Sequence, residues 1–378
     1  MLPKERVFTA LSHQEPDRVP TALWGGPYGL VDPLYHRLLD ILEIGEPLEP
    51  IRQGHTINFM DDRILTALDT DTRYIWPGAS PTSPTHISPK DENIILDDFG
   101  QPWKKTFPYY SATDGLLKNT DSLDAIDDLV QWPEINDPKW TQGVSERALA
   151  LKNSEYFIIG RMVVSHGPFQ MACDLRSMEN FMMDMAVNQN FAHALLEKVT
   201  ETICGLTENY LRESAGTMDM IELPGDDYAA NDNLVFSPLL FRELIKPCIK
   251  TIVTKIKNIQ PDIKIMLHSD GAVEKLIPDF IELGIDVLHP LEPVSGMDPA
   301  KIKQKFGKEI SFLGGVDITH AMPGTILDVR QDVDRCLNDL SADGGFILAP
   351  CNHLQSDVPP KNVVELYRYA KKAGIYSA

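Results

Sequence analysis

Three side chains that bind metal ions well follow short apolar runs of the chain. The run KIMLH ends at His268, Asp270 stands two residues later, and the run GGFILAP is followed directly by Cys351. Residues two apart on a strand point to the same side, so His268 and Asp270 can share one cavity. An imidazole, a carboxylate and a thiolate make a three-ligand set for Zn²⁺ with one position left open. The alternative is a hydrogen-bonded His–Asp pair beside a cysteine that is only a small buried apolar residue.

Three acids near another apolar run, Glu222, Asp226 and Asp227, are candidate catalytic residues. Glu222 stands inside MDMIELP, where a carboxylate without a partner is costly, and a metal ion and His268 are equally good partners for it. Asp226 and Asp227 follow a Pro-Gly pair, where they could act as general acid or base and steer a substrate. Their alternative role is that of a turn-capping pair. Arg161, inside the run IIGRMVV, needs a counter-charge, which predicts a structural ion pair.

Four further residues are candidates for substrate contact: Trp24, Tyr28, His166 and Asp317. Trp24 and Tyr28 could form apolar walls for a flat substrate, although aromatic residues near strand ends are as often part of the core. His166 either lines the same cavity or is a satisfied core histidine. Asp317 ends an apolar run, and capping of the segment that enters near Thr319 competes with a role at the substrate.

The elements that carry these residues alternate regularly from about residue 155. The predicted strands are 155–167, 217–227, 262–271, 286–294, 309–318 and 344–352, with a first strand at 20–26. The predicted helices are 3–12, 189–215, 237–259, 273–284, 298–307, 327–341 and 360–374. This alternation is typical of a parallel sheet covered by helices, and seven or eight such units predict an α/β fold, a (β/α)₈ TIM barrel. No G-x-G-x-x-G motif follows a strand to favour a doubly wound sheet.

A barrel also accounts for where the reactive residues stand, because active sites of barrels lie at the carboxyl ends of the strands. The N-terminal third is more elaborate. Residues 75–140 are rich in Pro, Asp, Ser and Thr and lack the apolar periodicity of an independent core. We therefore predict a single domain over 1–378 with a loop and hairpin insertion at 75–140, including two short strands around Gly100.

The composition narrows the function classes. The 35 Lys and Arg against 55 Asp and Glu give a net charge of −20, which argues against nucleic acid and anionic membrane as partners. No apolar run approaches the roughly 18 residues of a membrane span, and the start lacks the apolar core of a signal peptide. The five cysteines are scattered without a C-x-x-C motif. We expect a cytoplasmic protein with reduced thiols.

Several segments together resemble the uroporphyrinogen decarboxylase superfamily. They are RVFTALSHQEPDRVP (6–20), FSPLLFRELIKPCIK (236–250), LHSDG (267–271), VLHPLEP (287–293) and GGFILAPCNHLQSDVPPKNV (344–363). The resemblance covers essentially the whole chain and implies a (β/α)₈ barrel. Decarboxylases of this superfamily carry an RQAGRY segment after the first strand that grips substrate carboxylates. Here that place reads WGGPYGLVDPLYHR, with no arginine before Arg37.

The chain is more similar to the other branch, the cobamide-dependent methyltransferases. In these, zinc is held by a His-x-Cys motif and a later cysteine, which match His268 and Cys351, whereas Asp270 replaces the middle cysteine. A carboxylate in place of a thiolate makes the ion harder and a stronger Lewis acid toward oxygen or nitrogen. The predicted function is a zinc-dependent methyltransferase that moves a methyl group between a small O- or N-methyl substrate and a corrinoid protein.

The corrinoid (cobalamin) is expected on that partner protein, because the D-x-H-x-x-G segment of a cobalamin-binding domain is absent from this chain. Two alternatives stay open. One is a metal-free decarboxylase or lyase that uses the same cavity, and the other is a non-catalytic barrel that binds a corrinoid or another ligand. The resemblance is also compatible with a homodimer.

Overall fold

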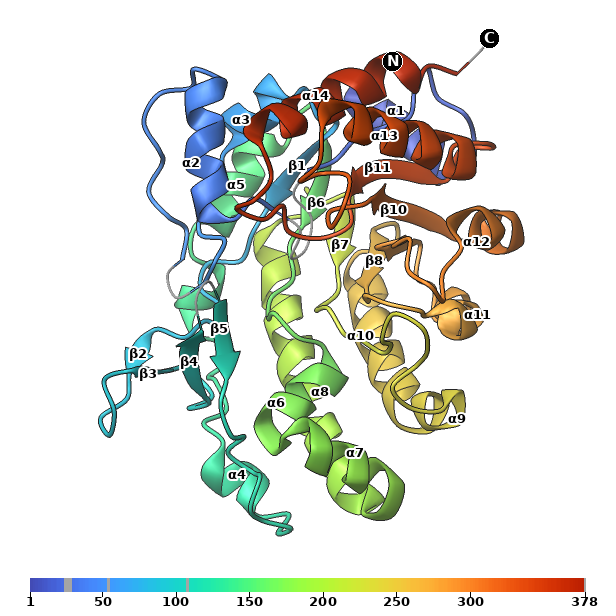
Figure 1. The fold of residues 1–378 in the computed structure, drawn as a ribbon. Coiled ribbons are helices and arrows are strands. Elements are labelled where there is room, and N and C mark those ends of the chain that lie inside the picture. Colours follow the sequence, from blue (N-terminus) through green and yellow to red (C-terminus); the bar gives the residue numbers. More distant parts are fainter. Residues whose placement is uncertain (24–28, 53–54, 107–108, 377–378) are drawn as a thin grey trace.

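The computed structural model describes residues 1–23, 29–52, 55–106 and 109–376. Its centre is a seven-stranded parallel sheet in the order β1-β6-β7-β8-β9-β10-β11, which curls behind a layer of helices (Figure 1). The strands are β1 (Thr72–Ile75), β6 (Phe157–Gly160), β7 (Met220–Glu222), β8 (Lys264–His268), β9 (Val287–His289), β10 (Ser311–Val316) and β11 (Phe346–Pro350). The predicted α/β class and its parallel sheet are confirmed.

Residues 20–22 lie between the two outer strands of this sheet. Thr21 forms a parallel bridge with Leu348 of β11, and its carbonyl accepts a hydrogen bond of 2.9 Å from the amide of Asp71, which precedes β1. The predicted strand at 20–26 therefore appears as a short bridge, and residues 24–26 fall outside the described residues. The segment joins the first and last strands without being a full strand itself.

The helices predicted from the regular part of the chain are present. They are α1 (Pro3–Leu11), α8 (Gln189–Glu213), α9 (Pro238–Leu240) leading through a π-helical turn (Phe241–Ile245) into α10 (Lys246–Ile259), a 3-10 turn (Glu274–Leu276) with α11 (Ile277–Glu282), α12 (Pro299–Phe306), α13 (Ile326–Leu340) and α14 (Pro360–Ala373). Apolar residues at helical spacing place one face of each longer helix on the sheet. In the described part of the chain, no helix is both long and apolar enough to span a bilayer.

The N-terminal half of the chain contains elements that the sequence pattern did not indicate. They are α2 (Asp32–Ile41), α3 (Asp62–Ala67), β1, α4 (Ala125–Leu129), a 3-10 turn (Pro138–Thr141), α5 (Val144–Leu151), and, after β6, α6 (Pro168–Arg176) and α7 (Met178–Val187). A separate antiparallel sheet joins β2 (His86–Ile87), β3 (Ile94–Leu96), β4 (Pro102–Thr106) and β5 (Tyr109–Ala112). β3 and β4 are the two short strands expected around Gly100, whose φ of +78° suits glycine in the turn.

Candidate active site

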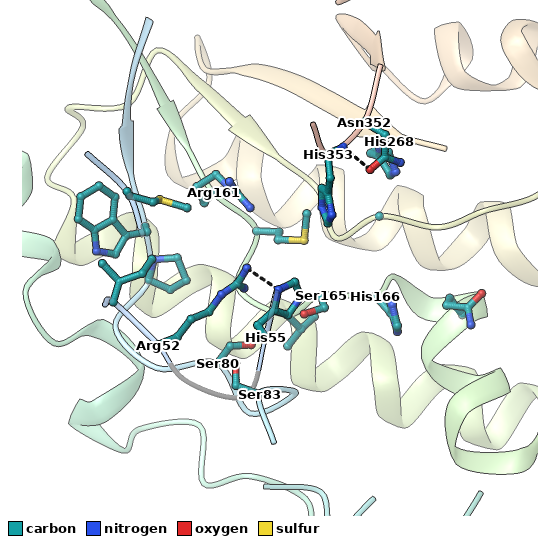
Figure 2. Close-up of a pocket in the computed structure, with 18 of the residues that line it drawn as sticks. Arg52, His55, Ser80, Ser83, Arg161, Ser165, His166, His268, Asn352 and His353 are labelled. Carbon is teal, nitrogen blue, oxygen red and sulfur yellow. Dashed lines mark hydrogen bonds between the residues drawn. The ribbon is translucent and has the colours of Figure 1, made fainter. Parts of the chain in front are cut away.

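A cavity of about 420 Å³ opens at the carboxyl ends of the central strands (Figure 2). Its walls come from the segments after β1 and β6, the loops after β7, β8 and β11, and the connection between α2 and α3. The residues that carry its chemistry are Arg52, His55, Arg161, His166, Asp227, His268, Asp270, Asn352 and His353. This is the edge of the sheet at which a barrel holds its active site.

The acidic cluster of this cavity consists of Asp227, His268 and Asp270. One potential ligand atom from each lies within 4.8 Å of the others, and this is the cluster of metal-binding type found among the described residues. The amide of Asp270 donates to Asp227 Oδ1 at 2.9 Å, and Asn352 Nδ2 donates to Asp270 Oδ2 at 2.8 Å. These bonds hold both carboxylates beside His268, whose Nε2 is 3.8 Å from Asp270 Oδ2.

His268 is oriented by a second histidine. Its Nδ1 lies 2.7 Å from Nδ1 of the buried His289, the last residue of β9, and the two rings stack with their centroids 5.0 Å apart. His289 also contacts the backbone of Pro350, which has only a carbonyl to offer. His289 then donates to that carbonyl, its Nδ1 accepts from His268, and a lone pair remains on His268 Nε2. Neutral imidazole with this tautomer is the form that binds a metal ion.

Burial keeps both histidines neutral and leaves the cluster with excess negative charge. Burial lowers the pKa of His268 below its usual value and that of His289 well below it. Burial, together with the neighbouring charge of Asp227, raises the pKa of Asp270 to about 7. A divalent cation between these groups would remove the repulsion between the two carboxylates. The nitrogen and oxygen donors of the cluster therefore suit a divalent ion such as Zn²⁺.

Cys351 is placed differently from the other two predicted ligands. Its side chain is fully buried, with Sγ 3.9 Å from the carbonyl oxygen of Leu291, and burial raises the pKa of the thiol well above its usual value. Within the described residues, the structure groups Asp227 rather than Cys351 with His268 and Asp270. The reason is local: Cys351 directly follows β11, and there its side chain enters the core beside Leu291.

The other predicted catalytic acids are held by protein groups. Asp226 accepts hydrogen bonds from the amides of Phe169 (3.0 Å) and Gln170 (2.7 Å) and from the Tyr228 hydroxyl (3.0 Å). It thus caps the start of α6, and burial raises its pKa to about 7. The buried Glu222 pairs with Arg161 at 3.4 Å. That partner is neither of the two expected from the sequence, and it supplies the counter-charge predicted for Arg161.

The residues predicted to contact the substrate lie in different parts of the structure. His166 lines the cavity, and its Nδ1 is 2.5 Å from Asp174 Oδ2. Although burial opposes its charge, Asp174 raises the pKa of His166 to about 9. Asp317 instead accepts from the Thr319 amide at 2.7 Å in a turn after β10, and it is not among the described residues that line the cavity. Trp24 and Tyr28 lie outside the described residues.

A family model for uroporphyrinogen decarboxylase (URO-D) matches residues 134–373. The chain belongs to the URO-D family. It is 25% identical over 182 residues to uroporphyrinogen decarboxylase of Hordeum vulgare, which is 47% of this chain and 50% of that protein. It is also 25% identical over 183 residues to the chloroplastic uroporphyrinogen decarboxylase 2 of Arabidopsis thaliana, which is 48% of this chain and 42% of that protein. The chain thus spans about half the length of the curated relatives it matches.

The same fold occurs in a solved structure, described as a methyltransferase from Methanosarcina mazei. The two chains superpose with a TM-score of 0.66 over 98% of this chain and 99% of the other, at 18% sequence identity. At that identity the match establishes the shared architecture. Together with the family model, it confirms the superfamily resemblance deduced from the sequence motifs.

The sequence patterns did not indicate Arg52 and His55, the residues on the cationic side of the cavity. Arg52 and His55 come from the irregular connection between α2 and α3, where no strand end or periodic pattern marks them. Arg52 Nε donates to the carbonyl of Ile57 at 2.8 Å, and its Nη2 lies 3.1 Å from His55 Nδ1. The role of His289 was equally hidden, although VLHPLEP was one of the motifs that indicated the family. The available signal was its place inside the predicted strand 286–294, which ends at His289 in the structure.

Proposed function

We propose that this URO-D family protein is a zinc-dependent methyltransferase that moves a methyl group between a small O- or N-methyl substrate and a corrinoid protein. The observation that carries the proposal is the acidic cluster, an imidazole and two carboxylates at the carboxyl edge of the sheet, in a cavity of about 420 Å³. His268 and Asp270 are proposed as metal ligands. Asp227 is proposed as the third, in the place that the sequence assigned to Cys351.

Zn²⁺ held by these residues would supply Lewis acidity toward the ether oxygen or amine nitrogen that loses the methyl group. The residues of the chain provide the rest. His289 holds the His268 ring, and Asn352 and the Asp270 amide fix the two carboxylates. Gly225 leaves room for the imidazole, since a Cβ there would lie 2.9 Å from His268 Cδ2. Met60, Trp76 and Val164 give the cavity an apolar part of its wall.

The proton balance of demethylation gives His166 a role. When the methyl group leaves without the bonding electron pair, the oxygen or nitrogen of the substrate keeps that pair and takes up a proton. Asp174 holds His166 through Nδ1, so the Nε2–H of the protonated ring is available as a donor to this leaving atom. In the proposal, Asp226 and Glu222 act indirectly, Asp226 by fixing α6 beside His166 and Glu222 by neutralising Arg161.

The same proposal includes closure of the parallel sheet into a complete barrel. Residues 20–23 would occupy the eighth strand position, between β11 and β1, and the whole chain 1–378 would form one (β/α)₈ barrel with 75–140 as an insertion. The corrinoid protein would dock over the carboxyl edge of the strands, because that edge holds the cavity.

The first test is the zinc content of protein never exposed to chelator. We expect near-stoichiometric zinc in the wild type and in Cys351→Ala, and its loss in His268→Ala. Cys351→Ala is the matched control, since it also alters a residue at the carboxyl end of a strand of the parallel sheet. Zinc well below one ion per chain in the wild type would contradict the metal site. If zinc is present, O- and N-methyl compounds are then tested as donors of a methyl group to a reduced corrinoid.

A metal-free decarboxylase is the second candidate, and the similarity to curated decarboxylases of barley and Arabidopsis favours it. It predicts loss of carboxylate from a porphyrinogen without added metal and no effect of His268→Ala on metal content. The metal content of the wild type and of His268→Ala therefore distinguishes the two candidates.

A further inference from the structure

Arg52 is the feature of the cavity that the proposed reaction does not use. Its guanidinium lines the cavity and is held by the Ile57 carbonyl through Nε and by His55 through Nη2. Neither contact uses Nη1, and the described residues give that nitrogen no hydrogen bond. Arginine presents a planar fork of donors, so one edge of this fork is left for a group inside the cavity.

Among the described residues, Arg52 has no close counter-charge. No Asp or Glu of the described residues forms an ion pair with it, whereas Arg161 on the same cavity pairs with Glu222. The carboxylate that acts on Arg52 is that of Asp32, whose two oxygens accept from Asn58. Burial and the charge of Arg161 lower the pKa of Arg52 to about 9. Arg52 is half-buried, and a cation partly removed from water without a counter-charge is costly unless a ligand supplies the anion.

The two ends of the cavity have opposite charge. Figure 2 shows Arg52 and His55 on one side of the view and His268 with Asn352 on the other. His353 lies beside His55, with the two ring centroids 6.4 Å apart. Burial and nearby cations lower the pKa of His55 well below its usual value and that of His353 to about 3, so both rings are neutral. A ligand therefore meets Arg52 and the uncharged imidazoles of His55 and His353 on one side, and on the other the acidic cluster together with His166, whose pKa Asp174 raises to about 9.

We propose that Arg52 binds a carboxylate of the methyl donor and thereby directs the methylated group toward the acidic cluster. The inference rests on the proposed function, whose substrate it restricts to small methylated acids. A carboxylate matches the fork of a guanidinium and carries the single negative charge that Arg52 lacks. In the metal-free protein, Asp227 and Asp270 repel a carboxylate, which disfavours the opposite binding orientation there. The cavity volume of about 420 Å³ suits a molecule with one ring.

The test is a binding measurement that needs no turnover. The 2-, 3- and 4-methoxybenzoates are titrated by calorimetry into the full chain as purified, each beside the methoxybenzamide of the same shape. The variants are Arg52→Gln, which removes the charge, and Arg52→Lys, which keeps it. Arg37→Gln is the control, because Arg37 lies on α2, bonds the carbonyls of Pro33 and Ser356, and is not among the described residues that line the cavity.

We expect at least one methoxybenzoate to bind wild type and Arg37→Gln roughly 10-fold or more tightly than its amide. Arg52→Gln should abolish this preference while binding the amide as before, which also shows that the variant is folded. Arg52→Lys should keep part of the preference. Equal binding of acid and amide, failure of all three acids to bind, or a preference that survives in Arg52→Gln would overturn the inference. The last outcome would place the carboxylate at the metal instead.

Failure of the proposed function is recognised separately. The zinc-loaded protein could bind the acid in a way that depends on Arg52 and yet transfer no methyl group to reduced corrinoid. That result would support the anion site and contradict the methyltransferase. Demethylation of neutral ethers that is unchanged in Arg52→Gln would support the methyltransferase and contradict the anion site.

Discussion

The two ends of the cavity are built on different kinds of structure. The acidic cluster stands at or just beyond the ends of β7 and β8, and the register of the sheet pairs His268 with His289 across β8 and β9. The cationic end stands on the connection between α2 and α3, where Arg52 is fixed by one backbone carbonyl and one histidine. The strand ends belong to a buried sheet with little freedom to move, whereas a surface connection can change length and sequence without disturbing the core.

This contrast suggests that the two ends of the cavity have different functions. A metal site needs ligand atoms held within a few tenths of an ångström, which strand ends provide. Selection among substrates needs only a charge at a suitable place, which a connection can supply. In a family that hosts both decarboxylases and methyltransferases, we infer that the strand ends carry the reaction and the α2–α3 connection selects the substrate.

The largest effect is expected from breaking the acidic cluster. Asp270→Asn keeps the shape of the side chain but removes a ligand charge, so zinc should be lost and methyl transfer should fall roughly 10³-fold, a barrier increase of about 4 kcal/mol. Elemental analysis and a corrinoid methylation assay measure the two effects. Asp317→Asn, in the turn after β10, is the control and should keep both. Full zinc and an unchanged rate in Asp270→Asn would remove Asp270 from the site.

A second prediction concerns the two arginines of the cavity. Arg161 and Glu222 are both buried, so Glu222→Gln leaves an uncompensated cation and should lower the free energy of unfolding by about 3 kcal/mol. Arg52→Gln should change it by less than about 1 kcal/mol, since no ion pair is lost. Denaturant unfolding measures both. Equal destabilisation by the two substitutions would mean that Arg52 is as much a structural residue as Arg161.

A third prediction tests how the acidic cluster is held. His289→Leu removes the acceptor for His268 Nδ1 and should weaken zinc binding about 10- to 100-fold, measured by competition with a chelating dye. His289→Gln should recover part of the affinity, because an amide can accept from His268 and donate to the Pro350 carbonyl. Weakening of the same size in both variants would indicate that packing of the ring, rather than its hydrogen bond, supports His268.

Much of the fold was predictable because the sheet is buried on both faces. Its strands from β6 onward are short apolar runs, and their ends mark where His268 and Asp270 must lie. β1 was missed because its Arg73 looks unsuited to a buried strand. That guanidinium donates to the Thr72 carbonyl at 2.7 Å and stacks 3.5 Å above the Tyr156 ring, contacts that only the folded chain supplies.

The candidate site was predictable only where a strand fixes it. Cys351 stands one residue beyond β11, and spacing alone does not say whether a side chain there enters the cavity or the core. Asp227 belongs to a loop, so its approach to Asp270 depends on a bond to a backbone amide that no local pattern reveals. Arg52 was missed for the same reason, since only the three-dimensional contacts show that no carboxylate of the described residues pairs with it.

The smallest predicted effect belongs to His166, which lies on the cavity wall between strand end and helix. Asp174 raises the pKa of His166 to about 9, against about 6.5 for an unperturbed histidine, so the folded state binds this proton more tightly than the unfolded state. Its contribution to stability is therefore complete below about pH 6.5 and is lost as the pH rises through about 9. The wild type should exceed His166→Gln in stability at pH 6 by a margin that shrinks toward pH 9.5. Thermal unfolding across this range measures the margin, and Asp174→Asn should remove its pH dependence. A margin that stays constant with pH would show that His166 is not held as a cation, and the donor to the leaving atom would have to be sought elsewhere on the cavity wall.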